Sequence, residues 1–392
     1  MRILLTGGGT GGHLYPALSL AQALSAAPAD PGVCSPDDPS VALPLLDGGH
    51  ELLFIGTRGG MEAEVIARTH IPLAIVSSGP MSRTSLTRAV GGLAASAVGT
   101  AQALPIVKRF KPDVVIATGG YTSVPAVMAA ATLRTARVLR GTKIALIEPN
   151  VEPGRANRLM ANVADEVWGA YAETGKFFPK KFVLTGIPVR AEIAARPTQV
   201  EARRSLGLDP KLTTVLIFGG SQGSRTINVA TSAMIARRRL PRTWQVLHAS
   251  GERDHEWMKA ERKVETSGNR YHLVKYLDDM ALAYAAADVA VCRAGASTLA
   301  ELAAVGLPSI LIPYPHAADD HQRKNARLFA GHNAAVVIED TGLDPDSLYW
   351  ALVNALDPDK NVVMRLGAAQ LAHPRALDIM IERIIKGKIG TR

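Results

Sequence analysis

The sequence predicts an α/β protein of two domains, each a parallel sheet covered by helices. The length of 392 residues suits two domains of ordinary size. Short β-branched runs alternate with Ala- and Leu-rich helical stretches along the whole chain. A strand followed by a glycine turn occurs in both halves, at residues 4–11 and again at 216–223. This internal repeat indicates two similar domains that each begin with a glycine-rich loop.

The predicted strands form two sets, separated by a proline-containing junction at residues 187–212. The first set is residues 3–6, 52–55, 114–118, 143–147, 166–169 and 182–185. The second set is residues 214–218, 245–249, 272–275, 289–292, 309–312 and 335–338. Continuous apolar strands between helices are typical of parallel sheets that are buried on both faces. We therefore expect domains over residues 1–187 and 188–365.

Residues 26–49 depart from this alternation. They contain five prolines with Asp and Gly between them, which favours an exposed insertion between the first helix and the second strand. No segment reaches the roughly 18–20 unbroken apolar residues that span a bilayer; the most apolar, residues 89–106, includes Gly, Ser, Thr and Gln. The N-terminus does not resemble a secretory signal. These features predict a cytoplasmic protein.

The net charge of +9 and the pI of about 9.6 suggest an anionic partner, although solubility alone would also explain them. Aromatic residues make up only 5% of the chain, and no basic run is interleaved with them, which argues against nucleic acid as the partner. Cys34 and Cys292 lie far apart and form no metal-ligand pair. We expect no cofactor and no metal, and the adjacent Asp319 and Asp320 do not change this expectation.

The first glycine turn, residues 7–13, lies between a strand and a helix. Glycines allow close backbone approach to a ligand, and the helix N-terminus offers free N–H groups to a phosphate or diphosphate. Gly7, Gly9 and Gly12 also match a dinucleotide-binding pattern, but no acidic residue follows the second strand, which ends at Gly56 and Thr57. A tight turn without a ligand is the third interpretation. His13 either contacts a diphosphate, accepts a proton or only orders the turn.

Three further motifs follow predicted strands. The turn at residues 219–224 repeats the anion-binding pattern and adds the Ser221 hydroxyl, and residues 119–123 form another glycine turn. Glu301 lies in the first turns of the helix after the strand at 289–292. A carboxylate there either accepts hydrogen bonds from ribose hydroxyls or is stabilised by the helix dipole.

Taken together, six motifs resemble those of the MurG family, the N-acetylglucosaminyltransferases of peptidoglycan synthesis. They lie at residues 8–16, 119–125, 148–158, 185–190, 219–228 and 293–308. The resemblance covers nearly the whole chain except residues 26–49. It implies the GT-B fold, in which two Rossmann-like domains face a cleft, with segment 366–392 returning to the first domain. It also implies an inverting, metal-independent enzyme in which the 4-hydroxyl of a lipid-linked MurNAc-pentapeptide attacks UDP-GlcNAc.

The resemblance also implies roles for particular residues. The residues expected to bind the donor are Thr10, Gly11, Gly12, Asn150, Arg190, Ser221, Leu277, Ala296, Ser297, Thr298, Leu299, Ala300, Glu301 and Gln322. Among them, Arg190 is expected at the diphosphate and Glu301 at the ribose. His13 is the first candidate for the catalytic base and Glu148 the second. This chain has Ile147 and Pro149 where the family has histidine and glutamine, which puts the role of that loop in question.

A lipid-linked acceptor implies a peripheral protein at the cytoplasmic face of an anionic membrane. The residues expected to touch the membrane are Met81, Arg83, Leu86, Arg88, Val90 and Leu93. An ordinary amphipathic helix with exposed arginines is the alternative. Three other functions stay open from sequence: an NAD-dependent oxidoreductase, a UDP-N-acetylglucosamine epimerase on the same fold, and a non-enzymatic basic binding protein.

Overall fold

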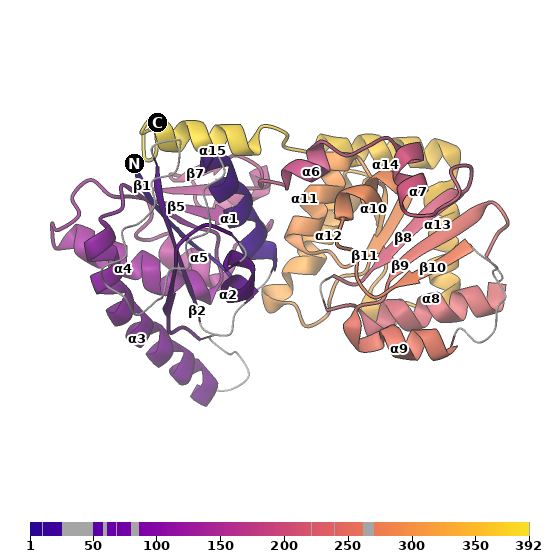
Figure 1. The fold of residues 1–392 in the computed structure, drawn as a ribbon, viewed down its shortest axis with the longest axis horizontal. Helices are drawn as coiled ribbons and strands as arrows, with labels where there is room; N and C mark the ends of the chain where they lie inside the picture. The colour runs from indigo at the N-terminus through magenta and orange to yellow at the C-terminus, as the bar shows by residue number, and fades with distance from the viewer. Residues whose placement is uncertain are drawn as a thin grey trace. The chain divides into compact units, whose positions relative to one another are not determined.

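The computed structural model describes residues 1–9, 11–25, 50–57, 61–67, 69–79, 86–220, 222–238, 240–261 and 270–391. These residues form two compact units. Unit 1 comprises Met1–Pro188 and Pro374–Arg392, and unit 2 comprises Val189–His373. Each is a parallel sheet with helices on both faces (Figure 1). The fold class predicted from the alternation of apolar strands and helices is confirmed.

Unit 1 contains a seven-stranded sheet in the order β3-β2-β1-β4-β5-β6-β7. Its strands are β1 (Arg2–Thr6), β2 (Glu51–Thr57), β3 (Leu73–Val76), β4 (Val114–Ala117), β5 (Lys143–Glu148), β6 (Glu166–Gly169) and β7 (Phe182–Leu184). Its helices are α1 (Gly11–Leu24), α2 (Met61–Ile66), α3 (Leu86–Phe110), α4 (Val124–Thr135), α5 (Arg155–Met160) and α15 (Ala376–Ile385), with short turns η1 (Tyr121–Ser123) and η2 (Ala172–Phe177). Strand β3 was missed from sequence: it is a four-residue edge strand directly after Pro72, too short for a clear period of apolar residues.

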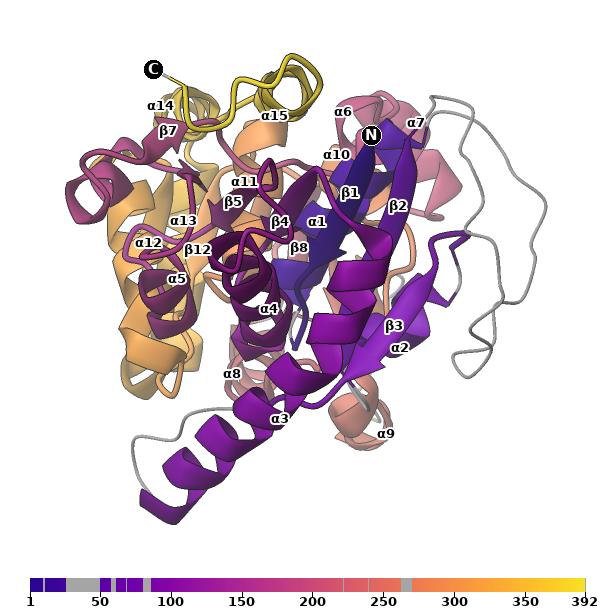
Figure 2. The ribbon, with the colours of Figure 1, turned by 90° about the vertical axis from the view of Figure 1, so that its left-hand side faces the viewer.

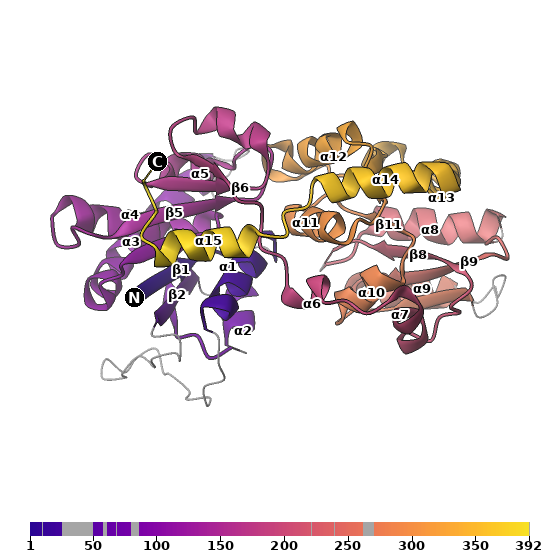
Figure 3. The ribbon, with the colours of Figure 1, turned by 90° about the horizontal axis from the view of Figure 1, so that it is seen from above.

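The two faces of this sheet are covered by different helices. Residues of α3, α4 and α5 pack with Leu4, Val115 and Leu146 in one core (Figure 2). The C-terminal helix α15 lies beside α1 (Figure 3). Strand residues alternate in direction, so neighbours along one strand are buried on opposite faces.

An ion pair ties the C-terminal segment to β6. Arg383 Nε lies 2.8 Å from Glu166 Oε2, and the Gly390 N–H donates to Glu166 Oε1 at 2.8 Å. Burial would raise the pKa of the Glu166 carboxyl, but the donors from Arg383, Trp168 and Gly390 outweigh it and lower this pKa below its usual value. Glu166 therefore remains ionised and holds the end of the chain on unit 1.

Unit 2 contains a six-stranded sheet in the order β10-β9-β8-β11-β12-β13. Its strands are β8 (Thr213–Phe218), β9 (Trp244–Ala249), β10 (Tyr271–Val274), β11 (Val289–Cys292), β12 (Ser309–Leu311) and β13 (Ala335–Val337). Its longer helices are α7 (Gln199–Ser205), α8 (Arg225–Arg238), α9 (Glu252–Glu261), α10 (Met280–Ala286), α11 (Ala296–Val305), α12 (His321–Gly331), α13 (Pro345–Leu356) and α14 (Pro358–Gln370). Shorter elements are α6 (Ala191–Ala194), η4 (Ala318–Asp320) and η5 (Asp340–Gly342). The predicted second set of strands is confirmed to within one or two residues at each end.

Candidate active site

In unit 1, the loops that carry the predicted catalytic residues follow neighbouring strands. Thr6 pairs with Ala117 between β1 and β4, and Ala117 pairs with Leu146 between β4 and β5. Because the strands are parallel, the first glycine turn, the 118–123 turn and the Glu148 loop all leave the same edge of the sheet. Ligands bind at this edge in open α/β sheets.

His13, in the first turns of α1, has a fixed ring orientation. Its Nδ1 lies 2.7 Å from the carbonyl oxygen of Thr118, and the Thr118 hydroxyl donates to the carbonyl oxygen of His13 at 2.5 Å. A carbonyl only accepts, so Nδ1 carries the proton in the neutral ring and Nε2 carries the lone pair. Gly119, at φ 95°, leaves room for this ring, since a Cβ there would lie 3.0 Å from Nδ1. His13 is thus held in the tautomer that a general base at Nε2 requires.

Glu62, which sequence reasoning missed, holds the first glycine turn from α2. Its carboxylate is fully buried and accepts hydrogen bonds from the Gly9 N–H at 3.1 Å, the Thr57 N–H at 3.1 Å and the Thr57 hydroxyl at 2.6 Å. A Cβ on Gly8 would lie 2.3 Å from this carboxylate. A glutamate in the first turn of a helix is normally explained by its favourable interaction with the helix dipole. Nothing in the sequence therefore pointed to this contact.

Glu148, the second candidate base, is buried and anchors its own loop. Oε1 accepts from the N–H and the side-chain amide of Asn150, both at 3.0 Å, and Oε2 accepts from the Gly154 N–H at 3.1 Å and the Asn157 amide at 2.9 Å. Burial raises the pKa of Glu148 to about 7, against the lowering effect of these four donors. The Asn150 amide, predicted at the donor sugar, therefore also binds Glu148. The side chains of Ile147 and Pro149 take no part in these hydrogen bonds, and only the Ile147 carbonyl oxygen accepts from the Asn157 amide, at 3.0 Å. The loop therefore keeps this carboxylate anchor despite both replacements.

In unit 2, the loops after β8, β9 and β11 leave one edge of the sheet, because Phe218 pairs with both Ala249 and Cys292. The turn after β8 closes through a hydrogen bond from the Gly223 N–H to the Gly220 carbonyl oxygen at 3.0 Å. Gly220 and Gly223 have φ values of 89° and 75°, and a Cβ on Gly223 would lie 2.4 Å from the Ser250 carbonyl oxygen. Only glycine fits at that position.

Glu301 lies on α11, whose N-terminus follows Gly295. Arg190, the N-cap residue of α6, donates to Glu301 Oε1 from Nη2 at 2.9 Å and from Nε at 3.1 Å. The Tyr284 hydroxyl donates to Glu301 Oε2 at 2.9 Å. Burial raises the pKa of Glu301, while Arg190 and Tyr284 act in the opposite direction. The structure thus brings together two residues predicted to bind different parts of one nucleotide.

The other predicted site residues are either outside the described part of the chain or have few contacts that define a role. Thr10, Ser221, Met81 and Arg83 lie outside the described residues, and the side chains of Leu86 and Arg88 are likewise not described. Gly11 and Gly12 begin α1, and Ala296, Ser297, Thr298, Leu299 and Ala300 form the first turns of α11. Leu277 is buried after β10, and Gln322 Oε1 accepts a hydrogen bond from the Tyr314 N–H at 2.9 Å. Val90 and Leu93 are exposed on α3.

Residues 39–168 match the N-terminal domain of glycosyltransferase family 28, and residues 214–377 match its C-terminal domain. The chain belongs to glycosyltransferase family 28. A relative from Moorella thermoacetica is 38% identical over 98% of this chain and 99% of its own length. A second, from Desulforudis audaxviator, is 37% identical over the full length of both. Both are named UDP-N-acetylglucosamine–N-acetylmuramyl-(pentapeptide) pyrophosphoryl-undecaprenol N-acetylglucosamine transferase.

Solved structures agree on the fold. MurG of Acinetobacter baumannii superposes with a TM-score of 0.72 at 24% identity, covering 98% of this chain and 99% of its own. UDP-GlcNAc 2-epimerase of Neisseria meningitidis superposes with a TM-score of 0.62 at 11% identity, covering 98% and 100%. Both support the fold of two α/β units, each built on a parallel sheet. Because fold similarity alone does not separate transferase from epimerase, it is the full-length relatives that exclude the epimerase, oxidoreductase and non-enzymatic alternatives.

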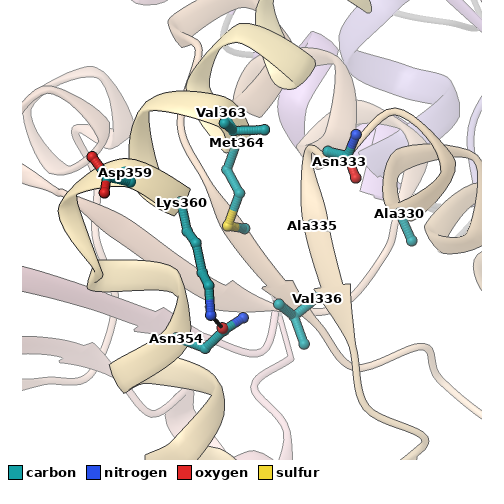
Figure 4. Close-up of a pocket in the computed structure, with 9 residues that line it drawn as sticks. All are labelled: Ala330, Asn333, Ala335, Val336, Asn354, Asp359, Lys360, Val363 and Met364. Carbon is teal, nitrogen blue, oxygen red and sulfur yellow. Dashed lines mark hydrogen bonds between the residues drawn. The ribbon is translucent and has the colours of Figure 1, made fainter.

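A cavity of about 320 Å³ lies in unit 2 at the amino end of β13 (Figure 4). It is lined by Ala330, Asn333, Ala335, Val336, Asn354, Asp359, Lys360, Val363 and Met364. The Lys360 ammonium donates to the Asn354 amide oxygen beside it. The predicted donor-binding residues follow the carboxyl ends of the strands, so this cavity is not part of the candidate site.

Three other features of the described residues concern a metal site, a cysteine and an apolar segment. The described residues contain no group of three or more His, Cys, Asp or Glu side chains that could hold a metal ion. Cys292 is buried at the end of β11, and burial raises the pKa of its thiol well above the ordinary value. Its thiol therefore stays neutral and packs as a small apolar group.

The described part of the chain also has one segment, Val90–Phe110 in α3, that is long and apolar enough to cross a membrane by length and composition.

Proposed function

We propose that this family 28 enzyme transfers N-acetylglucosamine from UDP-GlcNAc to the MurNAc 4-hydroxyl of undecaprenyl-diphosphoryl-MurNAc-pentapeptide. The observation that carries the proposal is the 38% identity, over nearly the full length of both chains, to a transferase named for this substrate pair. The reaction forms a β-1,4 bond with inversion at the anomeric carbon and releases UDP.

His13 is the proposed base. Its Nε2 lone pair accepts the proton of the attacking hydroxyl, and the Thr118 carbonyl stabilises the imidazolium that forms by accepting from Nδ1. Glu148 is better suited to positioning, because each of its carboxylate oxygens already accepts two hydrogen bonds. We therefore assign it to the 148–157 loop rather than to proton transfer.

Unit 2 is the proposed donor-binding unit. The N–H groups of the 219–224 turn and the N-terminus of α11 stabilise negative charge as the diphosphate leaves, and Arg190 adds a full positive charge. Glu301 accepts hydrogen bonds from the ribose hydroxyls. These groups neutralise the leaving group without a metal ion.

The proposed location is peripheral, at the cytoplasmic face of an anionic membrane. Helix α3 presents Val90 and Leu93 to solvent, with Lys108 and Arg109 in its last turn. Exposed apolar side chains suit a lipid interface, and the basic side chains of the same helix, about 22 Å further along its axis, add attraction to anionic headgroups. α3 packs along α4 and β3, which supports a helix that lies on the membrane rather than one that crosses it.

The test is release of UDP from UDP-GlcNAc with and without the lipid-linked MurNAc acceptor. We expect release that depends on the acceptor, together with a disaccharide product. Turnover of UDP-GlcNAc in the absence of acceptor, with formation of an epimer, would refute the proposal.

A further inference from the structure

A buried histidine lies on the strand next to the 219–224 turn. His248, on β9, has no exposed surface. Its Nε2 lies 3.0 Å from Asn228 Oδ1 on α8, and its Nδ1 lies 2.8 Å from the Tyr271 hydroxyl on β10. Burial lowers the pKa of His248 to about 3, so the ring is uncharged at neutral pH. Nothing in the proposed chemistry uses this ring.

The positions of the protons in this network follow from the oxygen atoms that can only accept hydrogen bonds. Both N–H bonds of the Asn228 amide are used: one donates to the Ser250 carbonyl oxygen at 2.9 Å and the other to Asp254 Oδ2 at 2.8 Å. Oδ1 of Asn228 is therefore the atom that faces His248, and Nε2 must be the donor. Nδ1 then accepts from the Tyr271 hydroxyl. One orientation of each side chain satisfies every contact.

The network reaches the nucleotide turn through the backbone after β9. The Ser250 carbonyl oxygen, held by Asn228, is the atom that a Cβ on Gly223 would meet at 2.4 Å. A Cβ on Gly251 would in turn lie 2.6 Å from Gly223 Cα. Gly223 in the turn and the Ser250–Gly251 backbone thus pack directly on each other.

The same network holds the start of α8, the helix whose N-terminus follows the turn. Asp254 accepts from Asn228 through Oδ2 and from Arg225 Nη1 through Oδ1, the latter at 3.0 Å. Arg225 is the first residue of α8, and its guanidinium lies 3.6 Å from the centre of the Trp257 ring. Movement of the Asn228 amide would therefore disturb both the Ser250 backbone and the start of α8, which flank the turn.

We propose that His248 is a positioning residue for the nucleotide-binding turn of unit 2, because its Nε2–H fixes the Asn228 amide that holds the Ser250 carbonyl against Gly223. The identity of the ligand, UDP, rests on the proposed function, whereas the positioning of the turn rests on the hydrogen bonds of His248 and Asn228 alone.

Two isosteric replacements separate the two ring nitrogens. In His248→Gln the side-chain N–H reaches the position of Nε2 and keeps the bond to Asn228. In His248→Asn the shorter amide reaches only the position of Nδ1 and loses that bond. Tyr271→Phe is the matched control, since it removes the partner of Nδ1 and leaves the Nε2 bond in place. Each variant is measured as the full chain by amide hydrogen exchange over residues 219–228 and by calorimetric titration with UDP.

We expect His248→Gln to match the wild type in both measurements. His248→Asn should exchange faster over the turn and bind UDP about ten-fold more weakly, the upper range of one lost buried hydrogen bond. Tyr271→Phe should lower the melting temperature without changing the Kd for UDP.

The proposal is overturned if His248→Asn leaves exchange over the turn unchanged, if His248→Gln fails to preserve it, or if Tyr271→Phe reproduces the full effect of His248→Asn. A wild-type protein that does not bind UDP would refute the proposed function instead, and the exchange comparison would still decide the role of His248.

Discussion

Arg190 and Glu301 form a two-pronged ion pair, with Arg190 Nη2 2.9 Å and Nε 3.1 Å from the same oxygen, Glu301 Oε1. The Glu301 side chain is 10% exposed, so this charge is largely removed from water. Arg190 was expected at the diphosphate and Glu301 at the ribose of one nucleotide. Their contact means that the arginine also favours the ionised form of the proposed ribose-binding carboxylate, against the effect of burial.

Replacing Arg190 with Ala should therefore alter the pH dependence of UDP binding as well as its strength. Burial already raises the pKa of Glu301, and loss of Arg190 removes an opposing charge, so this pKa rises further. The carboxylate then becomes protonated at a higher pH, and UDP affinity should fall more steeply between pH 8 and pH 5.5 than in the wild type. Calorimetric titration over this range provides the measurement. Arg196→Ala is the control, since that guanidinium contacts the backbone carbonyls of Ile193 and Val305. Parallel pH profiles for Arg190→Ala and the wild type would contradict this prediction.

His13→Ala should reduce turnover by more than about ten-fold, since general-base catalysis contributes about 10²–10⁴-fold. UDP binding should be largely unchanged, because the groups proposed to bind the nucleotide and its diphosphate, Arg190, Glu301 and the 219–224 turn, lie in unit 2. His332→Ala, a change on a histidine that bonds the Leu328 carbonyl at the end of α12, serves as the control. The comparison is of kcat and of the UDP dissociation constant, and a kcat equal to that of the wild type would remove His13 as the base.

Glu62→Gln should lower both stability and turnover. The Gly9 N–H and the two Thr57 donors need acceptors on both carboxylate oxygens, and glutamine replaces one oxygen with a further donor. A buried group left unpaired costs about 1–3 kcal/mol. Thermal unfolding measures the stability, and kcat measures the turnover. Glu51→Gln, a change in a partly exposed ion pair with Arg2, should have little effect on either, and equal behaviour of the two variants would count against a special role for Glu62.

The buried His248 predicts an acid-dependent loss of stability. Its pKa is lowered from 6.5 to about 3 in the folded chain, so below pH 6.5 the unfolded chain takes up a proton that the folded chain does not. Stability should fall by about 1.4 kcal/mol per pH unit below 6.5 from this group. As the pH is lowered from 7 to 5, the free energy of unfolding should therefore fall more steeply for the wild type than for His248→Gln, which lacks the titrating ring. Denaturant unfolding at several pH values measures the difference, and a constant difference across this range would show that the ring is not responsible.

Changing Val90 and Leu93 together to Asp should weaken binding to anionic vesicles by about ten-fold, because charged groups replace apolar ones at the proposed interface. Val362 and Leu366 on α14 provide a matched control in unit 2. Their exposed fractions, 58% and 62%, are close to the 58% and 53% of Val90 and Leu93. Vesicle co-sedimentation is the measurement. Equal losses in the two double variants would indicate nonspecific effects of added charge.

The sequence by itself determined the fold class and most of the strands, because apolar runs and glycine turns are local signals that a parallel sheet requires. It also located the turns at residues 7–13 and 219–224 and, through the resemblance, the reaction. Only the tertiary structure decided which side chains hold these turns. Glu62 reaches Gly9 across 53 positions, Arg190 reaches Glu301 across 111, and the His13 tautomer depends on a carbonyl 105 positions away. Such contacts follow from the order of the strands in the sheet, and no local pattern of residues encodes them.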